Sequence, residues 1–410
     1  MTSRAPCGRL LVVVLVAVVV AVAVAVVVLT VSRRSETRAP TAASVPGAQI
    51  GGSAPGSLVS AEPMPGFARS LVGSSMRSAR VLYRSGSGDT SAPTVVSAAV
   101  FSPRRTAPPG GWPVIAFAHA TAGIDEPCAP SYSDTLKGQV GVLDAFIRLG
   151  YAVAMPDYQG LGAPGVHQYL DARTAGLNTV DAVRALRATF PDISTRWGAY
   201  GGSQGGGASW AVAELGTRRA PDLTLVGAVA ISPAADVSGL VDKAQARTLT
   251  PDQGPTFQAV VESLARTHPD VDRDDFRRGD AARDWDVLSA CAGPLLDRRD
   301  AAVADLSVAD LAPRTTAAAD TVRRVLDSWA LPQGPSTTPL YVEYGGRDTF
   351  VDPRWTTAAL ARQCALGGSV TYRLDPDRGH GDVPTEQALE WLARRFAGTP
   401  ATSTCPSPGR

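Results

Sequence analysis

Short, continuous runs of apolar residues constrain the fold of this chain more than any other feature. They lie at residues 95–101, 114–118, 152–155, 197–200, 225–231, 340–344 and 370–374. Most of them do not alternate with polar residues, which is typical of strands that are buried on both faces of a mainly parallel sheet. Stretches with helical spacing lie between them, for example at 177–190 and 209–215. This alternation predicts an α/β fold with helices covering the sheet.

One long interval, residues 232–339, has no convincing strand and contains helix-like stretches at 256–267 and 316–331. The strand pattern resumes after it, as though a sheet had been interrupted. We therefore predict a helical cap over 233–338, inserted into a core formed by 67–232 and 339–397. An independent second domain is the alternative.

The amino-terminal region predicts attachment to a membrane. In residues 10–31 the only polar side chain is Thr30, and a helix of this length covers about 30 Å of bilayer hydrocarbon. We predict a signal anchor within residues 1–32, with cleavage and secretion as the alternative. Residues 33–66 are rich in Pro, Ala, Ser and Gly, as expected of a flexible stalk, and residues 398–410 form a similar tail.

Charge balance argues against a nucleic-acid partner. The chain has 39 Lys and Arg residues against 38 Asp and Glu residues, for a formal charge of +1. Such a balance gives no overall field that would attract a polyanion. The chain contains only two lysines, Lys137 and Lys243, so arginine supplies nearly all of its positive charge.

Four cysteines follow the predicted anchor, and their even number suits two disulfides: Cys128, Cys291, Cys364 and Cys405. No C-x-x-C pair is present and the four histidines are widely separated, which argues against a structural zinc site. Disulfides form in oxidising compartments, so we predict an extracytoplasmic domain. Four buried, reduced thiols are the alternative.

The segment Gly201-Gly202-Ser203-Gln204-Gly205 matches the G-x-S-x-G motif of a nucleophilic serine. The motif follows a predicted strand and precedes a predicted helix, which is the setting of a nucleophile elbow. A serine held at positive φ in this turn needs neighbours without a Cβ two residues away on each side. The N–H of Gln204, at the start of the helix, would then face an oxyanion. A dinucleotide loop is disfavoured because no register matches G-x-G-x-x-G; close helix packing is a further alternative.

A serine nucleophile needs a base and an orienting carboxylate, and both follow it in the chain. Asp348 lies just after the predicted strand 340–344, and His380 lies in a loop after the last predicted strand. The order Ser, Asp, His is that of α/β-hydrolases. Asp352 is an alternative acid. His119 is an alternative base, although it lies where such enzymes form the second part of the oxyanion hole.

Taken together, these motifs resemble the secretory lipase family of α/β-hydrolases. The resemblance covers residues 64–405 and depends on the segments 119–123 (HATAG), 128–132 (CAPSY), 156–162 (PDYQGLG), 167–170 (HQYL), 201–206 (GGSQGG), 345–348 (GGRD) and His380. It implies hydrolysis of carboxylic esters, including acylglycerols, with the cap holding the acyl chain. It also implies the disulfides Cys128–Cys291 and Cys364–Cys405.

The sequence departs from the family pattern at two positions. Ala120 stands where glycine is usual, which leaves the second oxyanion donor open between the N–H groups of Thr121 and Ala122. Gly202 stands where a larger residue usually precedes the nucleophile.

The sequence as a whole predicts an α/β-hydrolase that cleaves acyl esters as a lipase or carboxylesterase, with Ser203, Asp348 and His380 as the triad. The expected partners are an acyl ester or lipid substrate and a membrane contacted through residues 10–31; no metal or organic cofactor and no nucleic acid is implied. A peptidase or amidase on the same fold is one alternative, because the triad does not choose between esters and amides. A catalytically silent surface binding protein is the other.

Overall fold

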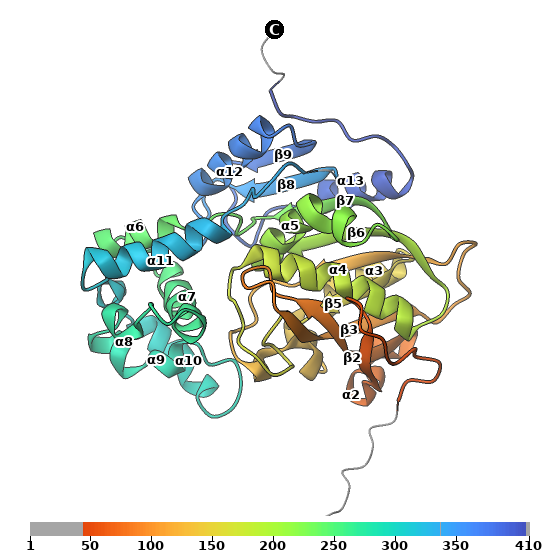
Figure 1. The fold of residues 1–410 in the computed structure, drawn as a ribbon, viewed down its shortest axis with the longest axis horizontal. Coiled ribbons are helices and arrows are strands. Elements are labelled where there is room, and N and C mark those ends of the chain that lie inside the picture. Colours follow the sequence, from red (N-terminus) through yellow and green to blue (C-terminus); the bar gives the residue numbers. More distant parts are fainter. Residues whose placement is uncertain (1–43, 337, 407–410) are drawn as a thin grey trace, which may run out of the picture. The chain divides into compact units, whose positions relative to one another are not determined.

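A sheet of nine strands forms the centre of the structure, in the order β1-β2-β3-β5-β4-β6-β7-β8-β9 (Figure 1). This computed structural model describes residues 44–336 and 338–406. The strands are β1 (Leu58–Pro63), β2 (Met76–Gly86), β3 (Pro93–Pro103), β4 (Trp112–Ala118), β5 (Ala152–Pro156), β6 (Ile193–Gly202), β7 (Thr224–Ile231), β8 (Leu340–Gly345) and β9 (Val370–Asp375). From β5 to β9 in this order all neighbours are parallel, whereas β1, β2 and β3 are antiparallel. The α/β-hydrolase fold with a mainly parallel sheet is therefore confirmed.

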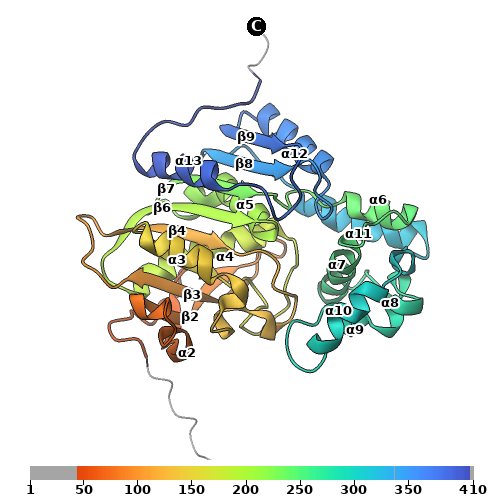
Figure 2. The same ribbon diagram turned by 180° about the vertical axis from the view of Figure 1, so that it is seen from behind.

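Helices cover both faces of the sheet. One face packs against α4 (Ala172–Thr189), α5 (Gln204–Arg219) and α12 (Pro353–Ala365). The other packs against α3 (Val140–Arg148) and α13 (Glu386–Phe396), which lie in front of the strands in Figure 2. A short helix, α2 (Pro65–Ala68), follows β1. The continuous apolar runs of the central strands are thus buried from both sides, as their sequence predicts.

The prediction of a flexible stalk over residues 33–66 is wrong for its later part. Residues 58–63 form β1, which pairs with β2, and Leu58 and Ala61 are fully buried. The strand is at the edge of the sheet, and only every second or third side chain faces the core, so its sequence shows no apolar run. β2 was also missed from the sequence, because its buried residues are separated by less buried ones that include arginines and serines.

The interval between β7 and β8 contains helices and, in the residues that the structure describes, no strand. These helices are α6 (Gly239–Ala246), α7 (Gln253–Thr267), α8 (Gly279–Arg283), α9 (Trp285–Leu288), α10 (Leu296–Asp305) and α11 (Thr316–Trp329). They pack around a hydrophobic cluster that includes Phe257, Phe276 and Trp285 and that extends to Ile124 and Tyr169 of the core. Figure 1 shows them grouped beside the sheet, with α6 and α11 nearest to β8. The helices occupy the interval for which the sequence predicts a cap, and we use that name for them below.

Both expected disulfides are present. Cys128 is bonded to Cys291, which links a loop of the core to the cap, and Cys364 is bonded to Cys405, which links α12 to the carboxyl-terminal tail. The tail also bonds to β9, because the N–H of Thr404 donates to the carbonyl oxygen of Val370 at 2.7 Å. Its residues up to 406 are therefore attached to the core.

The predicted membrane anchor, residues 10–31, lies outside the described residues. Among the helices of the described part, none has the length and apolar character needed to cross a bilayer.

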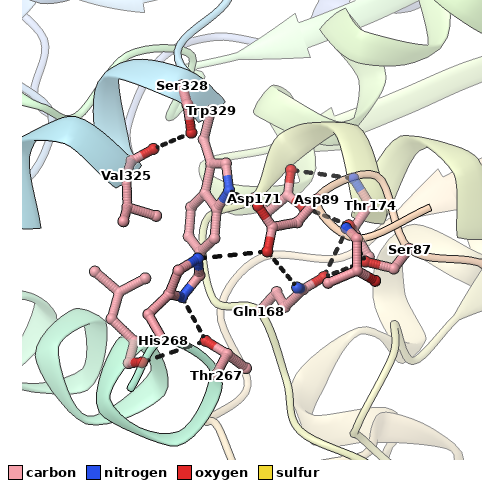
Figure 3. A network of polar contacts seen from close by, with 12 residues as sticks. Ser87, Asp89, Gln168, Asp171, Thr174, Thr267, His268, Val325, Ser328 and Trp329 are labelled. Carbon is pink, nitrogen blue, oxygen red and sulfur yellow. Dashed lines mark hydrogen bonds and ion pairs between the residues drawn. The ribbon is translucent and has the colours of Figure 1, made fainter. Parts of the chain in front are cut away.

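A polar network around Asp89 joins the cap to the core (Figure 3). Asp89 lies in the turn between β2 and β3. It accepts hydrogen bonds from the indole N–H of Trp329, at the end of α11, and from the side-chain amide of Gln168, each at 3.0 Å. His268, just after α7, approaches the same carboxylate with Nε2 at 3.5 Å. One core carboxylate thus contacts two cap helices.

We expect Asp89→Ala to loosen the cap. The substitution leaves the Trp329 and Gln168 donors without their acceptor, and each lost partner of a largely buried donor costs about 1–3 kcal/mol. Hydrogen exchange should accelerate in α7 and α11 while α4 and α5 stay protected. The control is Asp320→Ala, which removes an exposed carboxylate of α11 that lies 3.9 Å from Arg323. Equal exchange in the two variants would contradict the role of Asp89.

Candidate active site

Ser203 occupies the sharp turn between β6 and α5, with φ 57° and ψ −119°. This backbone conformation is strained for any residue with a side chain. Two backbone hydrogen bonds hold this turn against the end of β7. The N–H of Ser203 donates to the carbonyl oxygen of Ile231 at 2.9 Å, and the carbonyl oxygen of Ser203 accepts from the N–H of Ala234 at 3.0 Å. A Cβ on Gly201 would collide with the backbone of Gly205, and a Cβ on Gly205 would collide with the carbonyl of Ala118. The two glycines of the motif are thus required for the turn.

Gln204 begins α5, so its N–H belongs to the first turn, where no intrahelical acceptor exists. Its side-chain amide lies 2.9 Å from Nε2 of His167, and Nδ1 of His167 lies 2.9 Å from the carbonyl oxygen of Gln159. Burial lowers the pKa of His167 to about 4, so the ring is neutral, donates from Nδ1 and accepts at Nε2. This contact fixes the side chain of Gln204 and leaves its backbone N–H facing the turn.

His380 and Asp348 form a direct pair. Nδ1 of His380 lies 2.7 Å from Oδ2 of Asp348, and the other carboxylate oxygen accepts the N–H groups of Phe350 and Val351 at 2.8 and 2.9 Å. Asp348 is buried. The ring of Phe350 lies against the imidazole, with 4.9 Å between the centroids. The carboxylate therefore holds the ring by Nδ1 and leaves Nε2 available for proton transfer.

Ser203 and His380 line the same cavity, which has a volume of about 760 Å³. No hydrogen bond joins their side chains among the described contacts. Cap and core both contribute apolar side chains to the cavity wall, namely Ile124, Leu170, Ile231, Val237, Leu240, Leu288, Leu296, Val303, Phe350, Val351 and Val383. Ser203 and His380 thus have access to one largely apolar space, which both the core and the cap line.

The alternative acid and base lie in other contacts. Asp352 caps α12 and pairs with Arg354 at 2.6 Å; the hydrogen bond from Arg354 is the main reason why the pKa of Asp352 falls to about 2. His119 is buried and close to the backbone carbonyls of Ala120 and Asp157, at 2.5 and 3.3 Å. Burial lowers its pKa. Neither residue lines the cavity.

Thr121 and Ala122 line the cavity together with Ser203. The hydroxyl of Thr121 lies 2.9 Å from that of Tyr169, so the Thr121 side chain is already engaged. The structure does not choose between the backbone N–H groups of Thr121 and Ala122, so both are still candidates for the second oxyanion donor. Across the described residues, no group of three or more His, Cys, Asp or Glu side chains has a metal-binding arrangement.

Three residues of the site were missed as functional candidates from the sequence: Tyr169, Phe350 and the His167 that contacts Gln204. Tyr169 and His167 lie inside a motif of the family resemblance, but nothing in their spacing indicates what they touch. Phe350 follows Asp348 by two residues and shows no pattern of its own.

Comparisons with known proteins show a similarity to secretory lipases. Residues 132–283 match the family model of secretory lipases, so the predicted resemblance is confirmed. A Mycobacterium tuberculosis protein described as a probable inactive lipase is 24% identical over 81% of this chain and 76% of its own length. Lipase A of Arthroderma benhamiae is 26% identical over 68% of this chain, which spans 62% of that protein. The family supports ester hydrolase activity in general terms.

A solved structure shows the same fold. The closed state of Candida antarctica lipase A superposes with a TM-score of 0.68 at 18% identity, covering 87% of this chain and 85% of that one.

We expect Gly205→Ala to disrupt folding and Gly202→Ala to be tolerated. The new methyl group at 205 meets the carbonyl of Ala118 in a fully packed turn, at a cost of about 3 kcal/mol or more. At 202 the nearest heavy atom to a new Cβ is the carbonyl oxygen of Ile231 at 3.9 Å, so stability should change by less than about 1 kcal/mol. Thermal unfolding of the two variants measures the difference, and similar melting temperatures would refute the packing argument.

Proposed function

We propose that this protein hydrolyses carboxylic acyl esters through an acyl-enzyme, as a lipase acting on acylglycerols or as a carboxylesterase. The observation that carries the proposal is the cavity shared by Ser203 and His380, together with the 2.7 Å pair of His380 and Asp348. The resemblance to secretory lipases supports an extracytoplasmic location, with the apolar segment 10–31 as the proposed anchor.

Each residue has a defined part in the proposed reaction. Nε2 of His380 takes the proton of the Ser203 hydroxyl as its oxygen attacks the acyl carbon, and later gives that proton to the departing alcohol. Asp348 orients the ring and stabilises its cation. The N–H of Gln204, with that of Thr121 or Ala122, stabilises the oxyanion. Water then repeats the sequence, releasing the acid and restoring the serine.

The apolar wall of the cavity favours esters of apolar acids over peptides. A peptide group placed against these apolar side chains loses its hydration there, whereas an acyl chain gains free energy by burial. A peptidase or amidase remains the alternative within the fold. A silent binding protein is the alternative from another class, and the description of the mycobacterial relative as probably inactive gives it weight.

Replacement of Ser203 tests the function directly. We expect Ser203→Ala to lower turnover of p-nitrophenyl esters by about 10⁴-fold or more, because triad members act as a unit. The full chain should be assayed in detergent with esters of two to sixteen carbons. Ser209→Ala is the matched control, since that serine lies on the same helix, is buried and has no hydrogen-bond partner for its hydroxyl among the described residues.

Activity in the Ser203→Ala variant would overturn the assignment. Amide hydrolysis by the wild type without ester hydrolysis would favour the amidase alternative. Failure of a fluorophosphonate to label Ser203 in the folded protein would favour the alternative of a catalytically silent binding protein.

A further inference from the structure

Two cations line the cavity, and among the described residues neither forms an ion pair with a carboxylate. Lys137, one of the two lysines of the chain, comes from the core, and Arg299 comes from α10 of the cap. Nζ of Lys137 donates to the carbonyl oxygen of Cys291 at 2.9 Å, and Nε of Arg299 donates to that of Leu288 at 3.0 Å. Both cations therefore flank one short wall segment, residues 288–291, whose members all line the cavity.

Most of the hydrogen-bonding capacity of these cations is unused. Within the described residues, neither side chain forms an ion pair, and each makes a single hydrogen bond. An ammonium group has three donors and a guanidinium group five. Cations at an apolar wall lose hydration, and that loss is offset best by an anion that they bind together.

Among the described residues that line the cavity, Asp252 is the carboxylate. It accepts a hydrogen bond from the hydroxyl of Thr349 at 2.6 Å, in the turn that follows Asp348. In the part of the chain that the structure describes, Asp252 forms no ion pair with Lys137 or Arg299, so the two cations have no carboxylate partner in the cavity wall.

Tyr169 lies between Arg299 and a candidate oxyanion residue, Thr121, in its polar contacts. The hydroxyl of Tyr169 is hydrogen-bonded to that of Thr121. Burial raises the pKa of Tyr169, while hydrogen bonds with Thr121 and Thr256 and the positive charge of Arg299 lower it. Arg299 is therefore within electrostatic reach of the groups that surround the reacting carbonyl. Ser203, Lys137 and Arg299 line the same cavity, so one ligand in that cavity has access to all three side chains.

We propose that the preferred ester carries an anionic group, a phosphate or a carboxylate, which Arg299 and Lys137 bind while Ser203 attacks the acyl carbon. This inference rests on the proposed function and narrows its substrate class. The reaction stays a hydrolysis, in which the anionic group is bound and not transferred. A neutral triacylglycerol would leave both cations unpaired in the closed site.

Matched pairs of esters test the proposal. The first pair is a 1-acylglycerol and the 1-acylglycerol 3-phosphate with the same chain, which differ by a phosphate on the alcohol. The second is p-nitrophenyl butyrate and mono-p-nitrophenyl glutarate, which differ by a carboxylate on the acyl part. We expect kcat/KM for the anionic member to exceed that for the neutral one by about tenfold or more in at least one pair. The pair in which the anionic member has the higher kcat/KM shows whether the preferred anionic group is on the alcohol part or on the acyl part of the ester.

Variants assign the preference to its residues. Arg299→Met and Lys137→Met should each reduce the anionic-to-neutral ratio of kcat/KM about tenfold, mainly through KM. The control is Arg298→Met, because Arg298 neighbours Arg299 on α10 but is exposed and lies 3.6 Å from Asp284. The preference of the wild type should also weaken as salt concentration rises.

Equal kcat/KM for both members of both pairs would overturn the proposal, as would a preference that survives both cavity substitutions. A purely structural role of the two cations, as donors to segment 288–291, predicts reduced stability with an unchanged ratio. Absence of Ser203-dependent hydrolysis of every ester would instead remove the proposed function, so the two failures are distinguishable. Should a variant not fold, the wild-type pairs and their salt dependence still decide.

Discussion

The close approach of the first turn of α5 to β4 and β7 is the constraint on which the site depends. Gly205 packs against the carbonyl of Ala118, and Gly206 against that of Ile231, at distances that leave no room for a Cβ. This contact forces the chain to turn at Ser203 with positive φ. It also puts the first N–H groups of α5 beside the serine and joins the nucleophile to three neighbouring strands. Replacing Gly205 or Gly206 by a residue with a Cβ would therefore alter the packing of the core and the geometry at Ser203 together.

The parallel sheet brings together residues that are distant in the chain. β6, β8 and β9 run in the same direction, so Ser203, Asp348 and His380, which follow these strands, lie at one edge of the sheet. The sequence predicts this because continuous apolar runs identify strands buried on both faces. It could not predict β1 and β2, whose buried residues alternate with polar ones, or the pairing of Tyr169 with Thr121, because contacts between loops leave no periodic signal.

The cap is attached to the core at several places, and two of them have different physical bases. The disulfide between Cys128 and Cys291 is covalent and ends at the wall segment 288–291. Asp89 accepts a hydrogen bond from Trp329 of α11 and lies 3.5 Å from Nε2 of His268, just after α7. The covalent attachment lies beside the two unpaired cations. The disulfide therefore keeps the segment to which Lys137 and Arg299 donate attached to the core.

The strain at Ser203 bears on whether such a chain is an enzyme or a silent binding protein. A non-glycine residue at φ 57° and ψ −119° costs about 1–3 kcal/mol, which the surrounding packing must offset. A pocket that only binds a lipid needs an apolar wall and a polar anchor, and both are available here without the turn. The turn serves a different purpose, because it exposes one hydroxyl beside a helix amino terminus and opens onto the cavity that His380 lines. Asp348 likewise holds the imidazole of His380 by Nδ1, so the strained turn and the oriented ring are the two features that the proposed reaction uses and that a binding pocket does not need.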